Sequence, residues 1–449
     1  MNMNTKTGML SLTILILSSA ITMAAELVNQ SETIAITGDS ITYGGYPLLM
    51  DAYLNMCDAD APVRVVPFGW PGDSLASFWG RKCGAQPVMA SKPTVVTTLY
   101  GMNDSRYKQV NDNTIKWYKS GLQRMIDTYK SNGVKTIIIG SPTAVDTTTY
   151  KPRNGLDAAA FNQSLALLTE AARQIAEQNQ CRFVDLHHLI LEVMQKAKAM
   201  YGEDYHVMGA DGVHPSSNGR LIIAYAFLKA LGCTGDIATI TVDMKKQTAT
   251  ATQGHRVIDF KDNTIQLQSS RYPFCFKGDP TSPNATSGII ACLPFNEQLN
   301  RYILVVQNTP SHARFKVTWG EHSKIYSTEQ LAQGINLASE FLDNPFCKPF
   351  EKVYWFIVDK KCKWENRQYM HMLARLPAFH ADFTKELATL KPDVQSDIRK
   401  LLQIDPDAGQ SLDRLERTIL QADSQYAAKV SEIVRPVDHT IRIDLIDHQ

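Results

Sequence analysis

The N-terminal half of the chain alternates short apolar runs, rich in β-branched residues, with longer stretches in which apolar residues recur every three or four positions. The short runs predict five strands, at residues 33–37, 63–67, 94–100, 135–140 and 182–186. The helical spacing predicts three helices, over residues 114–129, 156–178 and 217–231. Short β-branched strands separated by helices are typical of a parallel sheet covered on both faces. We therefore predict an α/β domain, a flavodoxin-like three-layer α/β/α fold with a mostly parallel five-stranded sheet.

The pattern changes after Cys233, where short extended stretches follow one another without helices between them. These stretches lie at residues 237–242, 248–252, 264–267, 302–306 and 315–319. The last two predict an antiparallel pair, because apolar Phe315, Val317 and Trp319 alternate with polar residues. Ser327 and Gln330 form a capping-box pattern that predicts a helix ending near Pro345. The rest is mainly helical to about residue 434, and residues 440–445 predict a closing strand. The sequence thus predicts an α/β domain over residues 26–235 and a β-rich, then helical, accessory domain over residues 236–449.

The first 25 residues have the pattern of a signal peptide. Lys6 precedes an apolar stretch over residues 9–21, and small residues including Ala24 and Ala25 follow at the expected cleavage site. A membrane-spanning helix needs roughly 20 apolar residues, so an uncleaved anchor is the weaker alternative. We predict a secreted or periplasmic protein with no stable membrane insertion after signal cleavage.

Charge and cysteine content limit the binding partners, disulfides and metal sites that the sequence predicts. The chain has 46 basic and 45 acidic residues, a balance that gives no reason to expect nucleic acid or an anionic membrane surface as a partner. Its eight cysteines are an even number, which in an exported chain is compatible with disulfides. Their spacing suggests sequential pairs, but the connectivity stays open and free buried thiols are the alternative. Metal-type spacing and phosphate-binding loops are absent from the sequence, so we expect no metal and no cofactor.

Polar residues with catalytic potential follow several of the predicted strands. Ser40 comes directly after the first strand, Gly72 after the second and Asn103 after the third, and Asp211-x-x-His214 comes after the fifth. Each alone has an ordinary structural explanation as a cap, a turn or a loop contact. In a parallel sheet, however, all of these loops emerge at the carboxyl edge. Their joint placement therefore favours one shared crevice over separate structural roles.

Four sequence blocks in this order resemble the SGNH/GDSL hydrolase family of serine esterases. The blocks are Gly38-Asp39-Ser40, Gly72 within Gly69-Trp70-Pro71-Gly72-Asp73-Ser74, Gly101-x-Asn103-Asp104 and Asp211-x-x-His214. The resemblance covers about residues 30–233, and the first block reads Gly-Asp-Ser-Ile-Thr where Gly-Asp-Ser-Leu-Ser is commonest. The lipase-type Gly-x-Ser-x-Gly elbow is absent, which argues against the ordinary α/β-hydrolase fold.

This resemblance and the chemistry of the side chains predict the same roles. A serine hydroxyl needs a neighbouring base to become a good nucleophile, so Ser40 is the predicted nucleophile and His214 its base. Asp211 is predicted to orient the imidazole. The predicted oxyanion hole consists of the backbone N–H groups of Ser40 and Gly72 and the side-chain amide of Asn103.

Residues beside these blocks have less specific predictions. Asp39 and Asp104 are expected to hydrogen-bond loop backbone and not to act as further catalytic acids. Aromatic and arginine side chains flank the blocks and suit sugar rings, although packing or ion pairing explains them equally well: Tyr43, Trp70, Trp79, Arg81, Arg106 and Tyr107.

The sequence therefore predicts an exported serine ester hydrolase that works through an acyl-serine intermediate. The preferred substrate is an acylated glycan that carries short acyl groups, most simply acetyl. The region after residue 236 resembles those appended to secreted bacterial GDSL-type esterases, where we expect it to buttress the catalytic domain more than to bind glycan. The alternatives are a lipid or aryl esterase of the same mechanism, an acyltransferase, and a non-catalytic glycan-binding protein on a hydrolase scaffold.

Overall fold

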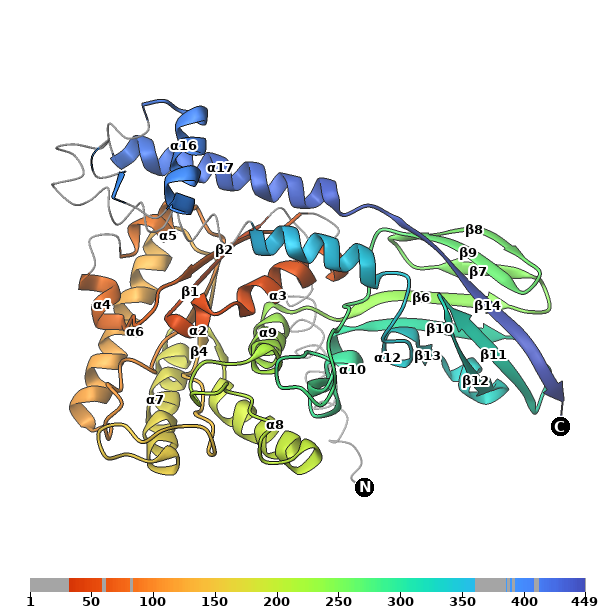
Figure 1. Ribbon diagram of the computed structural model, residues 1–449, viewed down its shortest axis with the longest axis horizontal. Helices are drawn as coiled ribbons and strands as arrows, with labels where there is room; N and C mark the ends of the chain where they lie inside the picture. The colour runs from red at the N-terminus through yellow and green to blue at the C-terminus, as the bar shows by residue number, and fades with distance from the viewer. Residues whose placement is uncertain are drawn as a thin grey trace, which may run out of the picture.

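The computed structural model describes residues 32–58, 62–80, 84–359, 385, 388–389, 392–407 and 412–448. The predicted signal peptide, residues 1–25, lies outside the described residues, as do Arg81, Cys83 and Cys362. Figure 1 shows an α/β part on the left and a β-rich part on the right, with a long helix lying across the top. No helix of the described residues is long and apolar enough to cross a bilayer.

A five-stranded sheet forms the centre of the α/β part. Its spatial order is β2-β1-β3-β4-β5 and every neighbouring pair is parallel. The strands are β1 (Thr33–Gly38), β2 (Arg64–Gly69), β3 (Val95–Leu99), β4 (Thr136–Gly140) and β5 (Arg182–Val184). This order is the flavodoxin-like one, in which the strand order reverses between β1 and β3. The loops on either side of that point leave a crevice at the carboxyl edge of the sheet. The predicted fold class and all five predicted strands are confirmed.

Helices cover both faces of this sheet, and the side chains of the strands alternate between two cores. In β1, Ile34 and Ile36 pack in one apolar cluster, whereas Ala35 between them packs in the other. The first cluster includes the helices α3 (Tyr46–Tyr53), α8 (Leu186–Tyr201) and α9 (Ser217–Leu231). The second includes α4 (Leu75–Gly80), α5 (Gln86–Ala90), α6 (Asp112–Ser131) and α7 (Ala158–Gln178). Both faces are therefore buried, which is why the strands read as continuous apolar runs.

The β-rich part contains two sheets. One has the order β13-β10-β6-β7 and the other the order β12-β11-β14-β9-β8. The strands are β6 (Asp236–Asp243), β7 (Thr248–Ala251), β8 (His255–Lys261), β9 (Thr264–Ser269), β10 (Arg301–Gln307), β11 (Ala313–Trp319), β12 (His322–Ser327), β13 (Ile335–Asn336) and β14 (Val437–His448). The predicted antiparallel pair of residues 302–306 and 315–319 is wrong. β10 pairs in parallel with β6, whereas β11 lies in the other sheet between β12 and β14.

Several short helices connect these strands. They are α10 (Phe295–Leu299), α11 (Thr328–Gln333) and α12 (Leu337–Glu340), together with a 3-10 turn at Ile289–Ala291. A π turn at Leu54–Asp58 follows α3 in the α/β part. The capping box is confirmed, because Ser327 and Gln330 exchange side-chain and backbone hydrogen bonds at the start of α11. The predicted length of this helix is wrong. Gly334, with φ of 95°, ends it well before Pro345.

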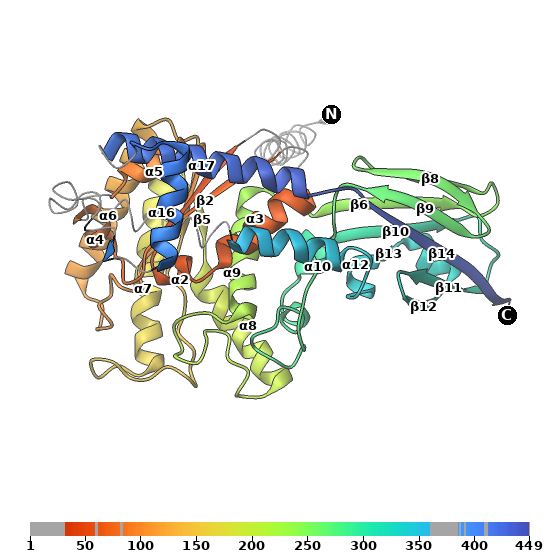
Figure 2. The same ribbon diagram turned by 45° about the horizontal axis from the view of Figure 1, so that its top comes forward.

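The C-terminal helices return to the α/β part. A helix covers residues 347–359, and α16 (Pro392–Ile404) and α17 (Leu412–Ile433) follow before β14 closes the second sheet. Figures 1 and 2 both show α17 lying against α5 and β2 before the chain enters β14. The buried carboxylate of Asp423 on α17 lies 2.6 Å from Arg64 Nε on β2, and Ile419 packs in the second apolar cluster. Residues distant in sequence thus complete the α/β layer at its β2 edge.

The cysteines do not form the predicted sequential disulfides. Those in the described part of the chain carry free thiols: Cys57, Cys181, Cys233, Cys275, Cys292 and Cys347. Cys275 Sγ donates to Pro273 O at 3.5 Å, and the cysteine with which its thiol interacts most strongly is Cys347, not Cys292. The fold explains this neighbour, because the turn at residues 344–347 packs against the segment that holds Cys275.

A buried polar network joins the strands of the second sheet to β10. Trp319 Nε1 donates to Nδ1 of His439 at 3.2 Å, and Nε2 of His439 lies 3.0 Å from Ser269 Oγ and 3.1 Å from Tyr302 Oη. Because the indole N–H only donates, Nδ1 must accept and the ring is neutral. Burial, with a smaller contribution from the nearby His255, lowers the pKa of His439 to about 3.

This network predicts a stability that depends on pH. In the unfolded chain His439 becomes protonated below about pH 6.5, whereas in the folded chain it does so only near pH 3. The contribution of neutral His439 to the free energy of unfolding is therefore full above pH 6.5 and is lost as the pH falls toward 3. We expect His439→Asn to lower the Tm at pH 7.5 and this deficit to shrink at pH 4.5. Calorimetry on wild type, the variant and exposed His312→Asn measures it. A deficit equal at both pH values would contradict the assignment.

Candidate active site

The local sequence places Ser40 at the carboxyl end of β1, which lies between β2 and β3 in the sheet. Gly38 ends the strand, and Asp39 caps the short helix α2 (Ser40–Tyr43) by accepting a hydrogen bond from Ile41 N at 2.9 Å. Ser40 is therefore the first helical residue, with its hydroxyl at the sheet edge and its backbone N–H at the helix N-terminus. Capping by Asp39 confirms that this carboxylate hydrogen-bonds loop backbone.

The structure brings Ser40, His214 and Asp211 together in one line of hydrogen bonds. His214 Nε2 lies 2.8 Å from Ser40 Oγ, and His214 Nδ1 lies 2.7 Å from Asp211 Oδ2. The other carboxylate oxygen of Asp211 accepts from the backbone N–H groups of Val213 and His214, each at 2.9 Å. The serine and histidine are 174 residues apart in the chain, so this contact is a product of the fold and not of local sequence.

The carboxylate beside the imidazole is held in its ionised form. Partial burial by itself raises the pKa of Asp211, but the hydrogen bonds from the His214 backbone and ring outweigh it and keep the pKa below its usual value. An ionised partner favours the tautomer with the proton on Nδ1 of His214, which leaves Nε2 free to accept from the serine hydroxyl. The side chains of His214 and Asp211 remain 46% and 44% exposed, so the site is open to a large substrate.

Donors for a developing oxyanion surround the serine. The backbone N–H groups of Ser40 and Gly72 have no hydrogen-bond acceptor within the described ranges. Gly72 has φ of 75°, a conformation that favours glycine, and the space around its missing Cβ is open. Asn103 Nδ2 donates to the backbone oxygen of Asp73 at 2.8 Å and to Asp39 Oδ2 at 3.3 Å. Both amide protons are thus engaged, and an incoming oxyanion would replace Asp39 as the acceptor of the longer bond.

Buried carboxyl groups support these donors from below. Asp104 accepts from the backbone N–H groups of Leu75 and Gly101 at 2.9 and 3.0 Å and so ties the loops after β2 and β3 together. This confirms its predicted role. Burial raises the pKa of Asp39 to about 8 and the pKa of Asp104 to about 7. These groups brace the loops of the site.

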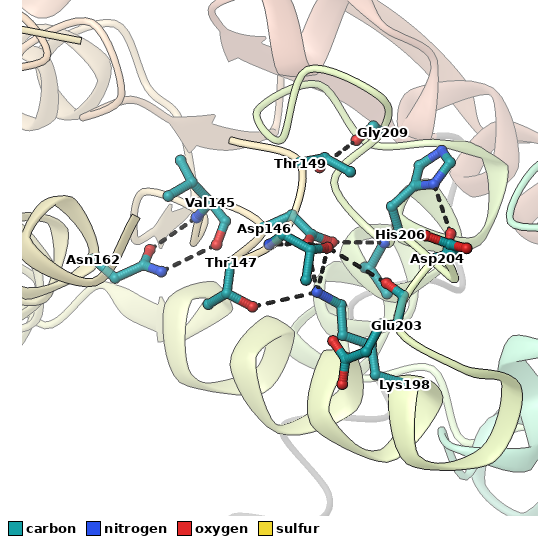
Figure 3. A network of polar contacts seen from close by, with 12 residues as sticks. Val145, Asp146, Thr147, Thr149, Asn162, Lys198, Glu203, Asp204, His206 and Gly209 are labelled. Atoms are coloured by element: carbon teal, nitrogen blue, oxygen red, sulfur yellow. Dashed lines mark hydrogen bonds and ion pairs between the residues drawn. The ribbon is translucent and has the colours of Figure 1, made fainter. Parts of the chain in front are cut away.

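The loop that carries Asp211 and His214 rests on the loop after β4 (Figure 3). The backbone N–H of Asp146 donates to Gly212 O at 2.8 Å, and its carboxylate accepts from Val207 N at 3.2 Å. Thr149 Oγ1 donates to Gly209 O at 2.9 Å. Gly212 has φ of 73° and its Cβ would meet Tyr150 N at 2.4 Å, so only glycine allows the two loops to approach this closely. The Asp-x-x-His block is thereby fixed before substrate binds.

A buried ion pair lies at the centre of this support. Lys198 Nζ on α8 donates to Asp146 Oδ1 at 2.6 Å, and both side chains are nearly inaccessible to solvent. Burial by itself raises the pKa of Asp146, but the hydrogen bonds from Lys198 and Thr148 hold it below its ordinary value. Sequence reasoning missed both residues. Neither lies in a recognisable motif, since a lysine on a helix and an aspartate 52 positions away give no pairing signal.

We expect Lys198→Met to destabilise the protein by about 3–5 kcal/mol, because it leaves a buried carboxylate without its partner. Urea unfolding monitored by circular dichroism measures this loss. The matched control is Lys196→Met on the same helix, whose pair with Glu192 at 2.6 Å is exposed and is expected to contribute less than about 1 kcal/mol. Equal effects of the two substitutions would contradict the role of the buried pair.

The flanking residues divide between packing and exposure. Trp79 packs against Phe78 and under the guanidinium of Arg124, 4.1 Å from the ring centre, and Tyr107 stacks on Phe161 at 5.4 Å. Tyr43 and Arg106 are exposed, and Trp70 is half-buried. Structural packing therefore accounts for Trp79 and Tyr107. Among the described residues no group of His, Cys, Asp and Glu side chains is arranged to hold a metal ion.

Comparison with known proteins agrees with this geometry. Residues 36–221 match the model of the GDSL-like lipase/acylhydrolase family. An acetylxylan esterase of Geobacillus stearothermophilus is 25% identical over 228 residues, which are 46% of this chain and 96% of that protein. A crystal structure of that esterase superimposes on 46% of this chain with a TM-score of 0.37 and 24% identity. A gut microbial diltiazem-metabolizing enzyme is 20% identical, covers 94% of this chain and 100% of its own, and has a TM-score of 0.67. Both parts of the fold thus recur together in a solved structure.

Proposed function

Because residues 36–221 form a domain of the GDSL-like lipase/acylhydrolase family, we propose that this chain is an exported serine esterase that removes short acyl groups, chiefly acetyl, from carbohydrate. The observation that carries the chemistry is the contact of 2.8 Å between His214 Nε2 and Ser40 Oγ, with Asp211 on the far side of the ring. The result is an activated hydroxyl beside two unpaired backbone donors.

The acylation half-reaction follows from these positions. Ser40 Oγ attacks the carbonyl carbon of the ester while its proton passes to His214 Nε2. The carbonyl oxygen becomes negative and is met by the N–H groups of Ser40 and Gly72 and by the amide of Asn103. When the tetrahedral intermediate collapses, the imidazolium gives its proton to the departing alcohol. Asp211 stabilises the imidazolium while it exists.

Deacylation runs the same steps with water in place of the alcohol. His214 takes a proton from water, the resulting hydroxide attacks the acyl-serine carbonyl, and the Ser40 oxygen leaves and is reprotonated by the imidazolium. The products are a carboxylic acid and the free serine. No other group need change its charge, so the three residues and the donor set complete the cycle.

The carbohydrate substrate is supported by two observations. The related Geobacillus stearothermophilus protein, matched over 96% of its length, is an acetylxylan esterase. The His214 and Asp211 side chains are nearly half exposed, which suits an acyl group that projects from a polymer. Export by the N-terminal segment would bring the enzyme to such a polymer.

Removing the side-chain donor gives a test of the oxyanion hole. We expect Asn103→Ala to lower kcat for 4-nitrophenyl acetate by about 10²–10³-fold with a small change in KM, because the amide acts mainly on the transition state. Steady-state kinetics measures both constants. A matched control is Asn111→Ala, which removes an amide that only caps α6. A rise in KM with unchanged kcat would contradict the assignment.

The substrate proposal is tested by acetate release from acetylated xylan and from other acetylated glycans. In parallel, hydrolysis of 4-nitrophenyl acetate, butyrate and octanoate by the purified protein reports the size of the acyl group. We expect acetate to be the preferred ester. A clear preference for octanoate, with no acetate released from any glycan, would exclude the carbohydrate proposal and favour a lipid esterase.

A further inference from the structure

A cavity of about 160 Å³ lies between the α/β part and the C-terminal part and is lined by residues of both. Its walls include Gly45, Ser217 and Arg220 from the α/β part. Gly45 follows α2, the helix that begins with Ser40, and Ser217 begins α9 three residues after His214. These two lining residues thus lie five positions after Ser40 and three positions after His214 in the chain.

Arg220 links the cavity wall to the loop that carries His214. Its Nε donates to the backbone oxygen of Pro215, the residue after His214, at 3.1 Å. One of its terminal nitrogens lies 3.6 Å from the place a Cβ would occupy on Gly45. The guanidinium makes no ion pair with a carboxylate of the described residues, and burial lowers its pKa. A half-buried cation without a counter-ion is a favourable partner for an anion.

The C-terminal part supplies aromatic walls. Phe274, Phe276, Phe350 and Tyr354 line the cavity, and the last two come from the helix over residues 347–359. Figures 1 and 2 both show this helix, in cyan, lying beside α3. A cavity of about 150 Å³ with apolar walls holds one benzene ring, so this one has the size of a single six-membered ring.

Charges at this cavity are mostly positive. Besides Arg220, Lys277 and Lys348 line it, against one carboxylate, Glu351. Lys277 Nζ lies 4.4 Å from the centre of the Tyr354 ring, and its charge also interacts with that of Glu351. Glu351 accepts from the indole of Trp355 at 3.2 Å. A ring that carries a carboxylate matches the aromatic walls and the excess of cations together.

The cavity also lies on the appropriate side for the leaving alcohol. Leu49 of its lining packs in the core under α3 and α9, whereas the oxyanion donor Gly72 leads into α4 on the opposite face of the sheet. His214 must reach the departing oxygen to protonate it, and Arg220 of the cavity wall donates to the backbone oxygen of Pro215, the residue that follows His214. A group held there belongs to the alcohol half of the ester and not to the acyl half.

We propose that this cavity binds the ring of the alcohol half of the substrate, and that the preferred ring is six-membered and carries a carboxylate. The proposal rests on the proposed ester hydrolysis and gives the C-terminal part a role in substrate selection beyond buttressing. Two sources offer this chemistry, a hexuronate of an acidic glycan and a hydroxybenzoate. The shared features are one ring with an apolar face and one anionic group.

The test compares the charge preference of matched lysine variants. Lys348 lines the cavity, whereas Lys352 is an exposed lysine on the same helix outside it. We measure kcat/KM for 4-acetoxybenzoate and phenyl acetate and take their ratio. Lys348→Glu is expected to lower this ratio about fivefold or more, and Lys352→Glu, with the same change in net charge, to leave it within twofold of wild type. An equal ratio in all three proteins would overturn the charge assignment.

A binding experiment tests the cavity proposal separately from the proposed ester hydrolysis. The full chain carrying Ser40→Ala is titrated with 4-hydroxybenzoate, phenol, glucuronate and glucose, with ligand-observed NMR as the readout. Each anionic ring is expected to bind more tightly than its neutral counterpart, and Cys347→Phe, which adds a ring to the lining, to abolish binding. The stronger anion identifies the source. Equal binding of anionic and neutral rings, or binding untouched by Cys347→Phe in a protein of normal Tm, would overturn the proposal even if ester hydrolysis is confirmed.

Discussion

Replacing Ser40 by alanine is expected to lower kcat for 4-nitrophenyl acetate by about 10⁴–10⁶-fold, because the remaining donors can only assist direct attack by water. The substitution removes one oxygen that is hydrogen-bonded to His214 at 2.8 Å, while Asp39 continues to cap α2 through Ile41. The fold should therefore be retained, with a Tm near that of wild type. Initial rates on purified proteins of verified Tm measure the effect.

The control for Ser40→Ala is Ser216→Ala. Ser216 lies two residues after His214 and precedes α9, but its side chain makes no capping hydrogen bond. We expect Ser216→Ala to retain kcat within a few-fold. If Ser40→Ala retained more than about a hundredth of wild-type kcat, attack by this serine would not be the route to product.

Replacing His214 by alanine is expected to lower kcat by about 10⁴–10⁶-fold, as replacing Ser40 does. Without the imidazole, no other described group lies within hydrogen-bond distance of the Ser40 hydroxyl to take its proton. Added imidazole is expected to restore part of the rate, because the open site leaves room for it where the 46% exposed side chain stood. Steady-state kinetics with and without imidazole measures both effects.

The chain contains its own control for this substitution. Asp185 and His188 repeat the Asp-x-x-His spacing and its geometry, with Nδ1 of His188 lying 2.7 Å from Asp185 Oδ2 and His188 N donating to Asp185 Oδ1 at 3.0 Å. In the described part of the chain, no hydrogen bond joins this second imidazole to a serine. His188→Ala should therefore leave kcat unchanged. Comparable losses in His188→Ala and His214→Ala would show that the effect comes from lost structure and not from catalysis.

This repeated motif shows what sequence can and cannot decide about the site. Asp185-x-x-His188 and Asp211-x-x-His214 are alike as local patterns, and both fold into the same local hydrogen-bonded pair. Both also follow β5, the last strand of the parallel sheet, so their position after that strand does not distinguish them. In the sequence the second is distinguished as the last of four blocks that resemble one family, and in the structure by its contact of 2.8 Å with Ser40 Oγ.

Other contacts left no trace in the sequence. The Asp146–Lys198 pair joins two elements with no shared motif, and the pairing of β10 with β6 instead of β11 depends on which sheet each strand enters. The alternation in β11 predicts a half-buried strand equally well with either partner. In the α/β part, by contrast, continuous apolar runs and helical periodicity leave few alternatives, and the sheet follows from them.

The sequence also did not predict how the C-terminal part packs against the α/β part. In the sequence, only the change from alternating strands and helices to consecutive short strands separates residues 26–235 from 236–449. In space, α17 covers the β2 edge through Asp423, and the helix over residues 347–359 lines a cavity together with residues of α3 and α9. Packing over hundreds of positions depends on tertiary complementarity, which local periodicity does not encode.

The central claim is that His214 activates Ser40, and covalent labelling tests it most directly. The wild-type protein is treated with a serine-reactive fluorophosphonate, digested and mapped by mass spectrometry. The account predicts a single adduct on the peptide that contains Ser40, formed in wild type and in His188→Ala and lost in His214→Ala. An adduct on another serine, or equal labelling of Ser40 with and without His214, would contradict it.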